Sequence, residues 1–184
     1  SDVPEMGEME LNPVSASKDG AVAADVRILV NFSPAPARFR PKHEDIVRDM
    51  NRIMKPKAVA VIGASSEAGK IGNSVMKNLI NGGYKGQIYP INPSADEIMG
   101  LKAYKSVKDV PGDIDVAVFA IPAKFVASAV AECGEKKIPG AVLIPSGFAE
   151  TGNVEGQKEL VAVAQKYGVR LMGPNIYGFY YTWS

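Results

Sequence analysis

The sequence predicts an α/β fold: a doubly wound, Rossmann-like parallel sheet of about five strands, preceded by an N-terminal β-hairpin. From residue 57 onward, short apolar runs alternate with amphipathic segments, which is typical of β-α-β units. The amphipathic segments are long enough for a parallel return of the chain. Before residue 30, an Asp-Gly pair lies between two strand-like segments, and this pair favours a hairpin turn.

The hairpin joins residues 9–14 to residues 21–30 through Lys18-Asp19-Gly20. If that turn has two residues, Val14 lies opposite Asp25, and Asn12 points from the same face as both. Asn12 and Asp25 are then expected to converge. Because a lone hairpin is marginally stable in water, we interpret residues 1–30 as part of a neighbouring domain that is mostly missing from this chain.

Residues 31–55 are interpreted as a linker followed by an amphipathic helix. Pro34, Pro36 and Pro41 predict an extended connection. An apolar stripe at residues 46–54, ending before Pro56, predicts a helix. This helix could cap the sheet or dock a partner.

The domain proper is expected at residues 56–178, with its strands at 57–63, 87–92, 115–121, 140–145 and 169–173. Apolar residues on one face predict a helix in each of three crossovers. These residues are Ile71, Val75, Met76, Leu79 and Ile80, then Phe125, Val126, Ala129, Val130 and Cys133, then Leu160, Val161, Ala164 and Tyr167. The aromatic residues 179–184 are interpreted as a tail towards a missing domain, and exposure of this tail would favour self-association.

Composition excludes several classes of function. Lys and Arg total 21 against 20 Asp and Glu, a net charge of +1, so no global field favours nucleic acid or a membrane surface. No apolar run reaches the roughly 20 residues of a membrane span. The single Cys133 excludes an internal disulfide and a multi-cysteine metal site, and the cytoplasm is the default expectation.

The candidate site lies where the strands end, because ligands of open parallel sheets bind beyond the carboxyl ends of the strands. The first strand runs into GASSEAGKIG, in which glycines permit a tight turn and expose N–H groups at a helix start. A phosphate is the expected ligand, and the positive charge of Lys70 is expected to balance part of its negative charge. The candidate residues are Gly63, Ala64, Ser65, Ser66, Gly69, Lys70, Ile71 and Gly72 in this loop, then Asn92, Pro122, Ala123, Ser146, Gly147 and Asn175 at the other strand ends.

Two nucleotide motifs do not fit the loop. A Walker A motif needs Gly at position 64 and a hydroxyl at position 71, where this chain has Ala64 and Ile71. A dinucleotide fingerprint needs G-x-G-x-x-G and an acid after the second strand, where this chain has Asn92. NAD is therefore disfavoured but stays open. A nucleotide-like ligand with a pyrophosphate and no acid-bound ribose, such as coenzyme A (CoA), fits better.

Five motifs in register with the strand ends carry a resemblance to a known family. GASSEAGKIGNSVMKNL, QIYPINP, DVAVFAIPAKFV, GAVLIPSGFAETG and GVRLMGPNIYG together resemble the CoA-binding domain of NDP-forming acyl-CoA synthetases, the family of ADP-forming acetyl-CoA synthetase and succinyl-CoA synthetase. The match covers residues 55–178. It implies that residues 64–71 hold the CoA phosphates and that the other strand ends line the rest of the crevice.

The hairpin resembles the end of the ATP-grasp domain of the same family, through Glu10-Leu11-Asn12-Pro13 and Ala24-Asp25-Val26-Arg27. By that resemblance Asn12 and Asp25 correspond to Mg²⁺ ligands, serving ADP or ATP only in the complete enzyme. Amide and carboxylate oxygens suit Mg²⁺. In this chain the end of an ATP-grasp domain would precede the start of a CoA-binding domain. This order suggests a permuted, fused synthetase.

The family also requires a phospho-histidine in a later domain, whereas the single His43 starts the linker helix beside Glu44 and Asp45 and is interpreted as a surface residue. We therefore expect the CoA-binding part of an acid–CoA ligase, acting with missing phospho-histidine and ATP-grasp domains or subunits and inactive by itself. A stand-alone CoA or nucleotide sensor is the alternative, and an NAD(P)-binding protein a weaker one. The acyl group and the choice of ADP or GDP stay open.

Overall fold

The N-terminal unit is a long antiparallel hairpin. The computed structural model describes residues 6–30 and 42–178, and the chain divides into two compact units at residues 41 and 42. In the first unit β1 (Met6–Leu11) pairs with β4 (Val26–Val30), and β2 (Val14–Ser17) pairs with β3 (Gly20–Ala23). The predicted hairpin is confirmed. The proline-rich residues 31–41 and the tail 179–184 lie outside the described residues.

The register of the hairpin differs from the predicted one. Val14 lies opposite Ala23 rather than Asp25, because the turn is built from Lys18 and Asp19 and closes at Ser17 and Gly20. The Ser17 hydroxyl oxygen accepts a hydrogen bond from the Asp19 N–H at 3.2 Å, and Ser and Gly at these outer positions are typical of a type I turn. Asn12 nonetheless lies opposite Asp25, since its N–H donates to the Asp25 carbonyl at 3.2 Å.

The second unit is built on a parallel five-stranded sheet in the order β11-β10-β9-β5-β6. Its strands are β5 (Ala58–Ile62), β6 (Gln87–Ile91), β9 (Val116–Phe119), β10 (Gly140–Leu143) and β11 (Arg170–Met172). All five predicted strands are confirmed. The strand order reverses between β5 and β9, and this switch point is where open α/β sheets bind ligands.

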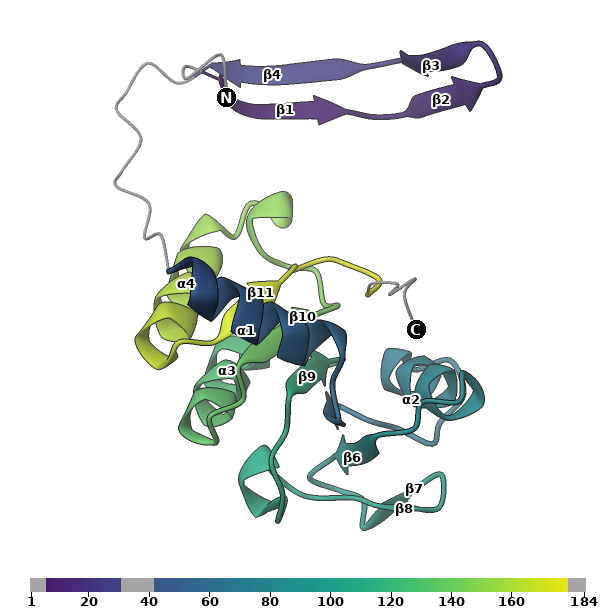
Figure 1. The fold of residues 1–184 in the computed structure, drawn as a ribbon, viewed down its shortest axis with the longest axis vertical. Coiled ribbons are helices and arrows are strands. Elements are labelled where there is room, and N and C mark those ends of the chain that lie inside the picture. Colours follow the sequence, from purple (N-terminus) through teal and green to yellow (C-terminus); the bar gives the residue numbers. More distant parts are fainter. Residues whose placement is uncertain (1–5, 31–41, 179–184) are drawn as a thin grey trace. The chain divides into compact units, whose positions relative to one another are not determined.

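Helices cover both faces of the sheet (Figure 1). Residues of α1 (His43–Met54) and α2 (Ile71–Asn81) pack into one core, and residues of α3 (Val126–Glu135) and α4 (Val154–Tyr167) pack into the other. Short 3-10 turns lie at Val107–Asp109, Ala123–Phe125 and Ala149–Thr151. A small hairpin of β7 (Glu97–Ile98) and β8 (Leu101–Lys102) follows β6 and was not predicted.

Alternate residues of each central strand feed the two cores. In β5, Val59 and Val61 contact the α1 and α2 side, whereas Ala60 and Ile62 contact the α3 and α4 side. A strand that is buried on both faces is apolar at every position. This requirement explains why these strands are apolar runs in the sequence rather than alternating patterns.

The predicted helical stripes are correct at their centres and wrong at their edges. Met76, Val130 and Leu160 are fully buried. Phe125, however, is 50% exposed because it belongs to the 3-10 turn before α3 and is out of phase with that helix. Ile71, at the start of α2, is 53% exposed. Ile80 and Val161 are 40% exposed, so an apolar side chain beside the stripe is not necessarily part of the core.

The linker helix α1 caps the sheet, which is one of the two roles expected for it. Ile53 is fully buried against the α1 side of the sheet. Asp49 accepts a hydrogen bond from Arg170 at 2.9 Å, and Asp115 accepts one from Arg52 at 2.9 Å. Asp115 also accepts hydrogen bonds from the N–H groups of Lys57 and Ala58. This one carboxylate therefore joins α1, the start of β5 and the start of β9.

We expect Asp115→Ala to lower the free energy of unfolding by about 1–3 kcal/mol, because partly buried donors lose a charged acceptor. Urea denaturation followed by circular dichroism measures this change. Asp96→Ala is the control, since the Asp96 side chain is 95% exposed in its ion pair with Lys105 and such pairs contribute little. Equal losses from both variants would contradict a joining role for Asp115.

Within residues 6–30 and 42–178, none of the helices combines the length and the apolar character that a membrane crossing needs.

Candidate functional site

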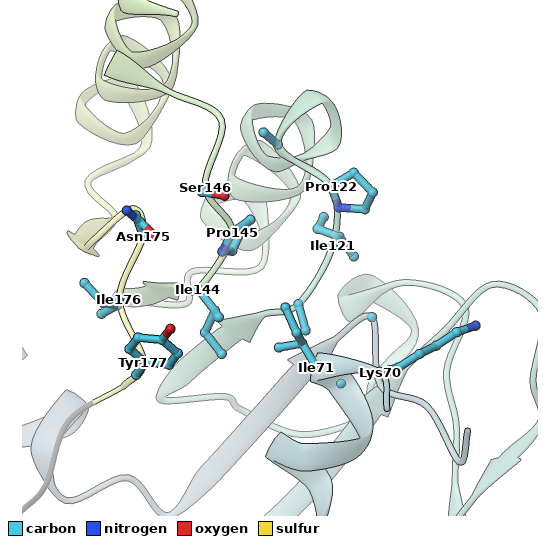
Figure 2. A pocket seen from close by; sticks show the side chains of 14 residues that line it. Lys70, Ile71, Ile121, Pro122, Ile144, Pro145, Ser146, Asn175, Ile176 and Tyr177 are labelled. Atoms are coloured by element: carbon cyan, nitrogen blue, oxygen red, sulfur yellow. The ribbon is translucent and has the colours of Figure 1, made fainter. Parts of the chain in front are cut away.

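A cleft of about 510 Å³ opens at the carboxyl ends of β5, β9, β10 and β11. Figure 2 shows Ile71, Ile121 and Ile144 facing one another across it, with Ser146 and Asn175 on its rim. The lining residues are Gly63, Lys70, Ile71, Gly72, Ala120, Ile121, Pro122, Ala123, Ile144, Pro145, Ser146, Asn175, Ile176 and Tyr177. The cleft is an apolar trough beside a glycine-rich loop at the switch point of the sheet.

Two glycines let the loop after β5 pack against its surroundings. A Cβ on Gly72 would lie 1.9 Å from the Gly63 carbonyl oxygen, so α2 starts in direct contact with the end of β5. Gly63 has φ +85°, and a Cβ there would lie 2.5 Å from the Ala120 carbonyl oxygen. Both glycines are therefore required by close approach of backbone to backbone.

The amino end of α2 faces the cleft without a side-chain cap. The N–H groups of Asn73 and Ser74 both donate to the Lys70 carbonyl, whereas the N–H groups of Ile71 and Gly72 precede the intrahelical ladder. Uncapped N–H groups and the helix dipole make such an end suited to an anion. The two residues that carry these free groups are cleft residues.

Polar side chains inside the loop support its backbone. Asn73, which is 3% exposed, donates from its side chain to the Ser65 carbonyl at 3.3 Å, and the Ser65 hydroxyl accepts the Glu67 N–H at 3.0 Å. The Asn92 side chain donates to the Ala64 carbonyl at 2.9 Å and accepts the Ser94 N–H at 2.8 Å. Asn92 thus braces the loop at the position where a dinucleotide-binding protein has a ribose-binding acid.

Lys70 is held away from the cleft. Its ammonium group lies 2.6 Å from the Glu67 carboxylate, and both side chains are more than half exposed. Figure 2 shows the Lys70 side chain extending outward, although Lys70 is one of the residues that line the cleft.

The loops after β10 and β11 are tied by backbone contacts. The Asn175 N–H donates to the Pro145 carbonyl at 3.1 Å. The Glu150 carboxylate accepts the Gly147 N–H at 2.7 Å and the Phe148 N–H at 3.3 Å. The Gly147 hydrogen bond lowers the pKa of Glu150 below its usual value, with a smaller contribution from Phe148. These bonds fix Ser146 and Asn175 at the rim.

The structure brings together about half of the predicted site residues. Those that line the cleft are Gly63, Lys70, Ile71, Gly72, Pro122, Ala123, Ser146 and Asn175. Those that lie outside its lining are Ala64, Ser65, Ser66, Gly69, Asn92 and Gly147. Of these, Ala64 is fully buried and Ser65 and Asn92 support the loop, so they shape the site from behind.

Sequence analysis missed the apolar part of the lining, which consists of Ala120, Ile121, Ile144, Pro145, Ile176 and Tyr177. The predicted ligand contacts were mainly small and polar residues after each strand. Most of the missed residues directly precede or follow those positions, so extending each strand end by two residues would have found them. Tyr177 projects fully into solvent at the rim.

The structure gives no new support to the other candidate groups. Asn12 and Asp25 form a cross-strand pair, and the described residues contain no cluster of three or more His, Cys, Asp or Glu side chains that could hold a metal. His43 is exposed at the first turn of α1. The interpretation of His43 as a surface residue agrees with this position.

Cys133 is fully buried in the α3 core, and burial raises the pKa of its thiol to about 12. We expect a thiol reagent at pH 8 to modify Cys133 in the folded chain at least about 100-fold more slowly than in urea, because reaction needs local opening and a thiolate. Absorbance at 412 nm with Ellman's reagent measures both rates. Comparable rates would show that Cys133 is accessible.

An open parallel sheet with an uncapped helix start and an apolar cleft at its switch point defines a Rossmann-like domain for a phosphate-bearing ligand. The comparison with known families identifies the kind of Rossmann-like domain, because residues 57–182 match the CoA binding domain. The chain belongs to this CoA-binding domain family, as the strand-end motifs indicated.

The curated relatives of this chain include ADP-forming acetate–CoA ligases. The chain is 43% identical over 173 residues to the ADP-forming acetate–CoA ligase II of Archaeoglobus fulgidus, a match that covers 93% of this chain and 25% of the relative. It is 49% identical over 140 residues to the alpha subunit of ADP-forming acetate–CoA ligase I of Pyrococcus furiosus, covering 72% of this chain and 30% of the relative. The chain thus spans between a quarter and a third of the length of these relatives.

A solved structure supports the fold. The dinucleotide-forming acetyl-coenzyme A synthetase 1 of Candidatus Korarchaeum cryptofilum, in complex with phosphate and ADP, matches with a TM-score of 0.70 and 48% identity. The match covers 72% of this chain and 28% of that chain. The Rossmann-like fold predicted from the sequence is confirmed.

Proposed function

We propose that this chain is the CoA-binding part of an NDP-forming acid–CoA ligase, which interconverts acyl-CoA, ADP and phosphate with acid, CoA and ATP. The observation that carries the proposal is the uncapped amino end of α2, whose first residues Ile71 and Gly72 open onto the cleft. Membership of the CoA-binding domain family supports CoA as the ligand.

In this proposal the N–H groups of Ile71 and Gly72 bind the pyrophosphate of CoA. The apolar walls formed by Ile121 and Ile144 pack against the uncharged pantetheine arm. Ser146 and Asn175 supply polar contacts at the rim. The contribution of the chain to catalysis is to bind CoA and to aim its thiol towards a site completed by other domains.

The remaining steps belong to domains or subunits outside this chain. A phospho-histidine domain would carry the phosphoryl group, and an ATP-grasp domain would bind ADP or ATP with Mg²⁺, for which Asn12 and Asp25 are the proposed ligands here. The chain by itself is then inactive in the full reaction. Cytoplasmic localisation and self-association through the aromatic tail stay predictions.

Two observations support the assignment of the hairpin to an ATP-grasp domain. Cross-strand pairing places Met9 beside Ile28 and Leu11 beside Val26, and all four side chains are about half exposed, so this face needs a covering layer. The match with the Archaeoglobus ligase covers 93% of the chain and therefore extends into residues 1–41. The hairpin and the CoA-binding unit are then parts of one fused synthetase.

Isothermal titration tests the proposal. We expect saturable binding of CoA, weaker binding of dephospho-CoA and little response to NAD or ADP. Lys70→Ala should weaken CoA binding about 3- to 10-fold, since one charge-assisted contact to phosphate is lost. Lys158→Ala is the control, because Lys158 forms a similar exposed ion pair on α4. Clear NAD binding without CoA binding would contradict the proposal and indicate a dinucleotide-binding protein instead.

A stand-alone CoA-binding module is the alternative. Addition of the missing domains distinguishes it from the ligase part: a ligase part gains CoA-dependent ATP formation with them, whereas a module binds CoA and stays inactive.

A further inference from the structure

The glycine-rich loop carries one positive and one negative side chain. Residues 63–72 contain Lys70 and Glu67 as their only charged residues, and these two form an ion pair with 2.6 Å between ammonium and carboxylate. The side chains of the loop therefore have no net charge, and the ion pair keeps the positive charge of Lys70 beside the negative charge of Glu67. An anion that approaches the loop is attracted by backbone N–H groups and the helix dipole alone.

The pair is placed by the loop backbone. The Glu67 N–H donates to the Ser65 hydroxyl at 3.0 Å, and the Lys70 N–H lies 3.4 Å from the Glu67 carbonyl oxygen. These contacts close a turn between Glu67 and Lys70, which are three residues apart in the sequence. The turn places the two side chains close enough to form the ion pair. Figure 2 shows the result for Lys70, which extends away from the cleft.

We propose that Glu67 is a specificity-determining residue that competes with the phosphates for Lys70 and so limits the contribution of charge to CoA binding. This inference rests on the proposed function of the loop. When CoA binds, the Lys70 ammonium exchanges the Glu67 carboxylate for a phosphate. An exposed ion pair is weak enough for such an exchange, while the Glu67 charge continues to repel the phosphates within a Debye length.

We therefore expect the loop to select its ligands by their geometry rather than by their charge. A ligand that satisfies the N–H groups of Ile71 and Gly72 binds, whereas a free anion that offers only charge gains little from the neutral loop. Glu67 also eases the release of CoA, because it supplies a partner for Lys70 when the phosphate leaves.

Glu67→Gln in the full chain tests the inference, because it removes the charge and keeps the size. Isothermal titration should show CoA binding about 3- to 5-fold tighter than in the unaltered chain at low salt, in line with the strength of exposed pairs. The difference should shrink at about 1 M salt, where the Debye length is about 3 Å. Pantetheine, which has no phosphate, should bind both chains equally.

Two controls separate this role from a structural one. Glu155→Gln breaks the corresponding exposed pair with Lys158 on α4 and should leave CoA affinity unchanged. In a Lys70→Ala chain, Glu67→Gln should raise the CoA affinity by a smaller factor, because only the repulsion between Glu67 and the phosphates is then removed. Unchanged or weaker CoA binding by Glu67→Gln would overturn the inference and leave the proposed function standing. Absence of CoA binding by the unaltered chain and by Glu67→Gln alike would overturn both.

Discussion

Gly72→Ala is expected to lower the free energy of unfolding by about 2–4 kcal/mol, since overpacking against rigid backbone is costly. The new Cβ would lie 1.9 Å from the Gly63 carbonyl oxygen, which no side-chain rotation can relieve. The start of α2 must therefore move away from the end of β5. Because this junction forms one wall of the cleft, CoA binding should be lost even where the variant is still folded.

Gly69→Ala is the matched control in the same loop. Gly69 has φ +87°, but a Cβ there has nothing within 4 Å, so the change costs only the strain of a positive φ, about 1–2 kcal/mol. Urea denaturation and isothermal titration of both variants measure the two effects. If Gly69→Ala is as destabilised as Gly72→Ala, close approach is not the reason for glycine at position 72.

Ile71→Pro is expected to weaken CoA binding about 10- to 100-fold while leaving α2 intact, since a hydrogen bond to a charged group contributes about 1.5–3 kcal/mol. Ile71 is the first residue of α2, a position that tolerates proline because its N–H has no intrahelical partner. Lys70 has φ −79° and ψ 143°, which suits a residue before proline. The substitution thus removes one N–H from the proposed pyrophosphate site and also replaces the Ile71 side chain with the smaller proline ring.

Ile71→Ala separates the N–H from the side chain. This variant keeps the N–H and removes the apolar surface that faces Ile121 and Ile144 (Figure 2), so its loss of affinity should be smaller. Circular dichroism checks that the helix content of both variants is unchanged. Equal affinities for Ile71→Pro and Ile71→Ala would show that the Ile71 N–H does not bind the phosphates.

Local patterns were sufficient to predict the sheet. Strands such as 58–62 are buried on both faces and must be apolar throughout, and three of the five strands, β5, β9 and β10, are followed by a helix with a clear apolar stripe. The same logic failed at Phe125, because a 3-10 turn changes the phase of the pattern before α3. It also failed at Val14, because the hairpin signal of Asp-Gly was overridden by a turn that begins at Ser17 and ends at Gly20.

The sequence by itself determined the fold class, the five strands, the family and the loop at the switch point, since each of these depends on local periodicity or on short motifs. Tertiary structure alone decided which loop residues face the cleft. It placed the Asn92 side chain against the Ala64 carbonyl, paired Lys70 with Glu67 and brought Ile71, Ile121 and Ile144 from three separate segments to one cleft. Such contacts join residues far apart in the chain, and their geometry is set by how the helices pack on the sheet rather than by any local pattern.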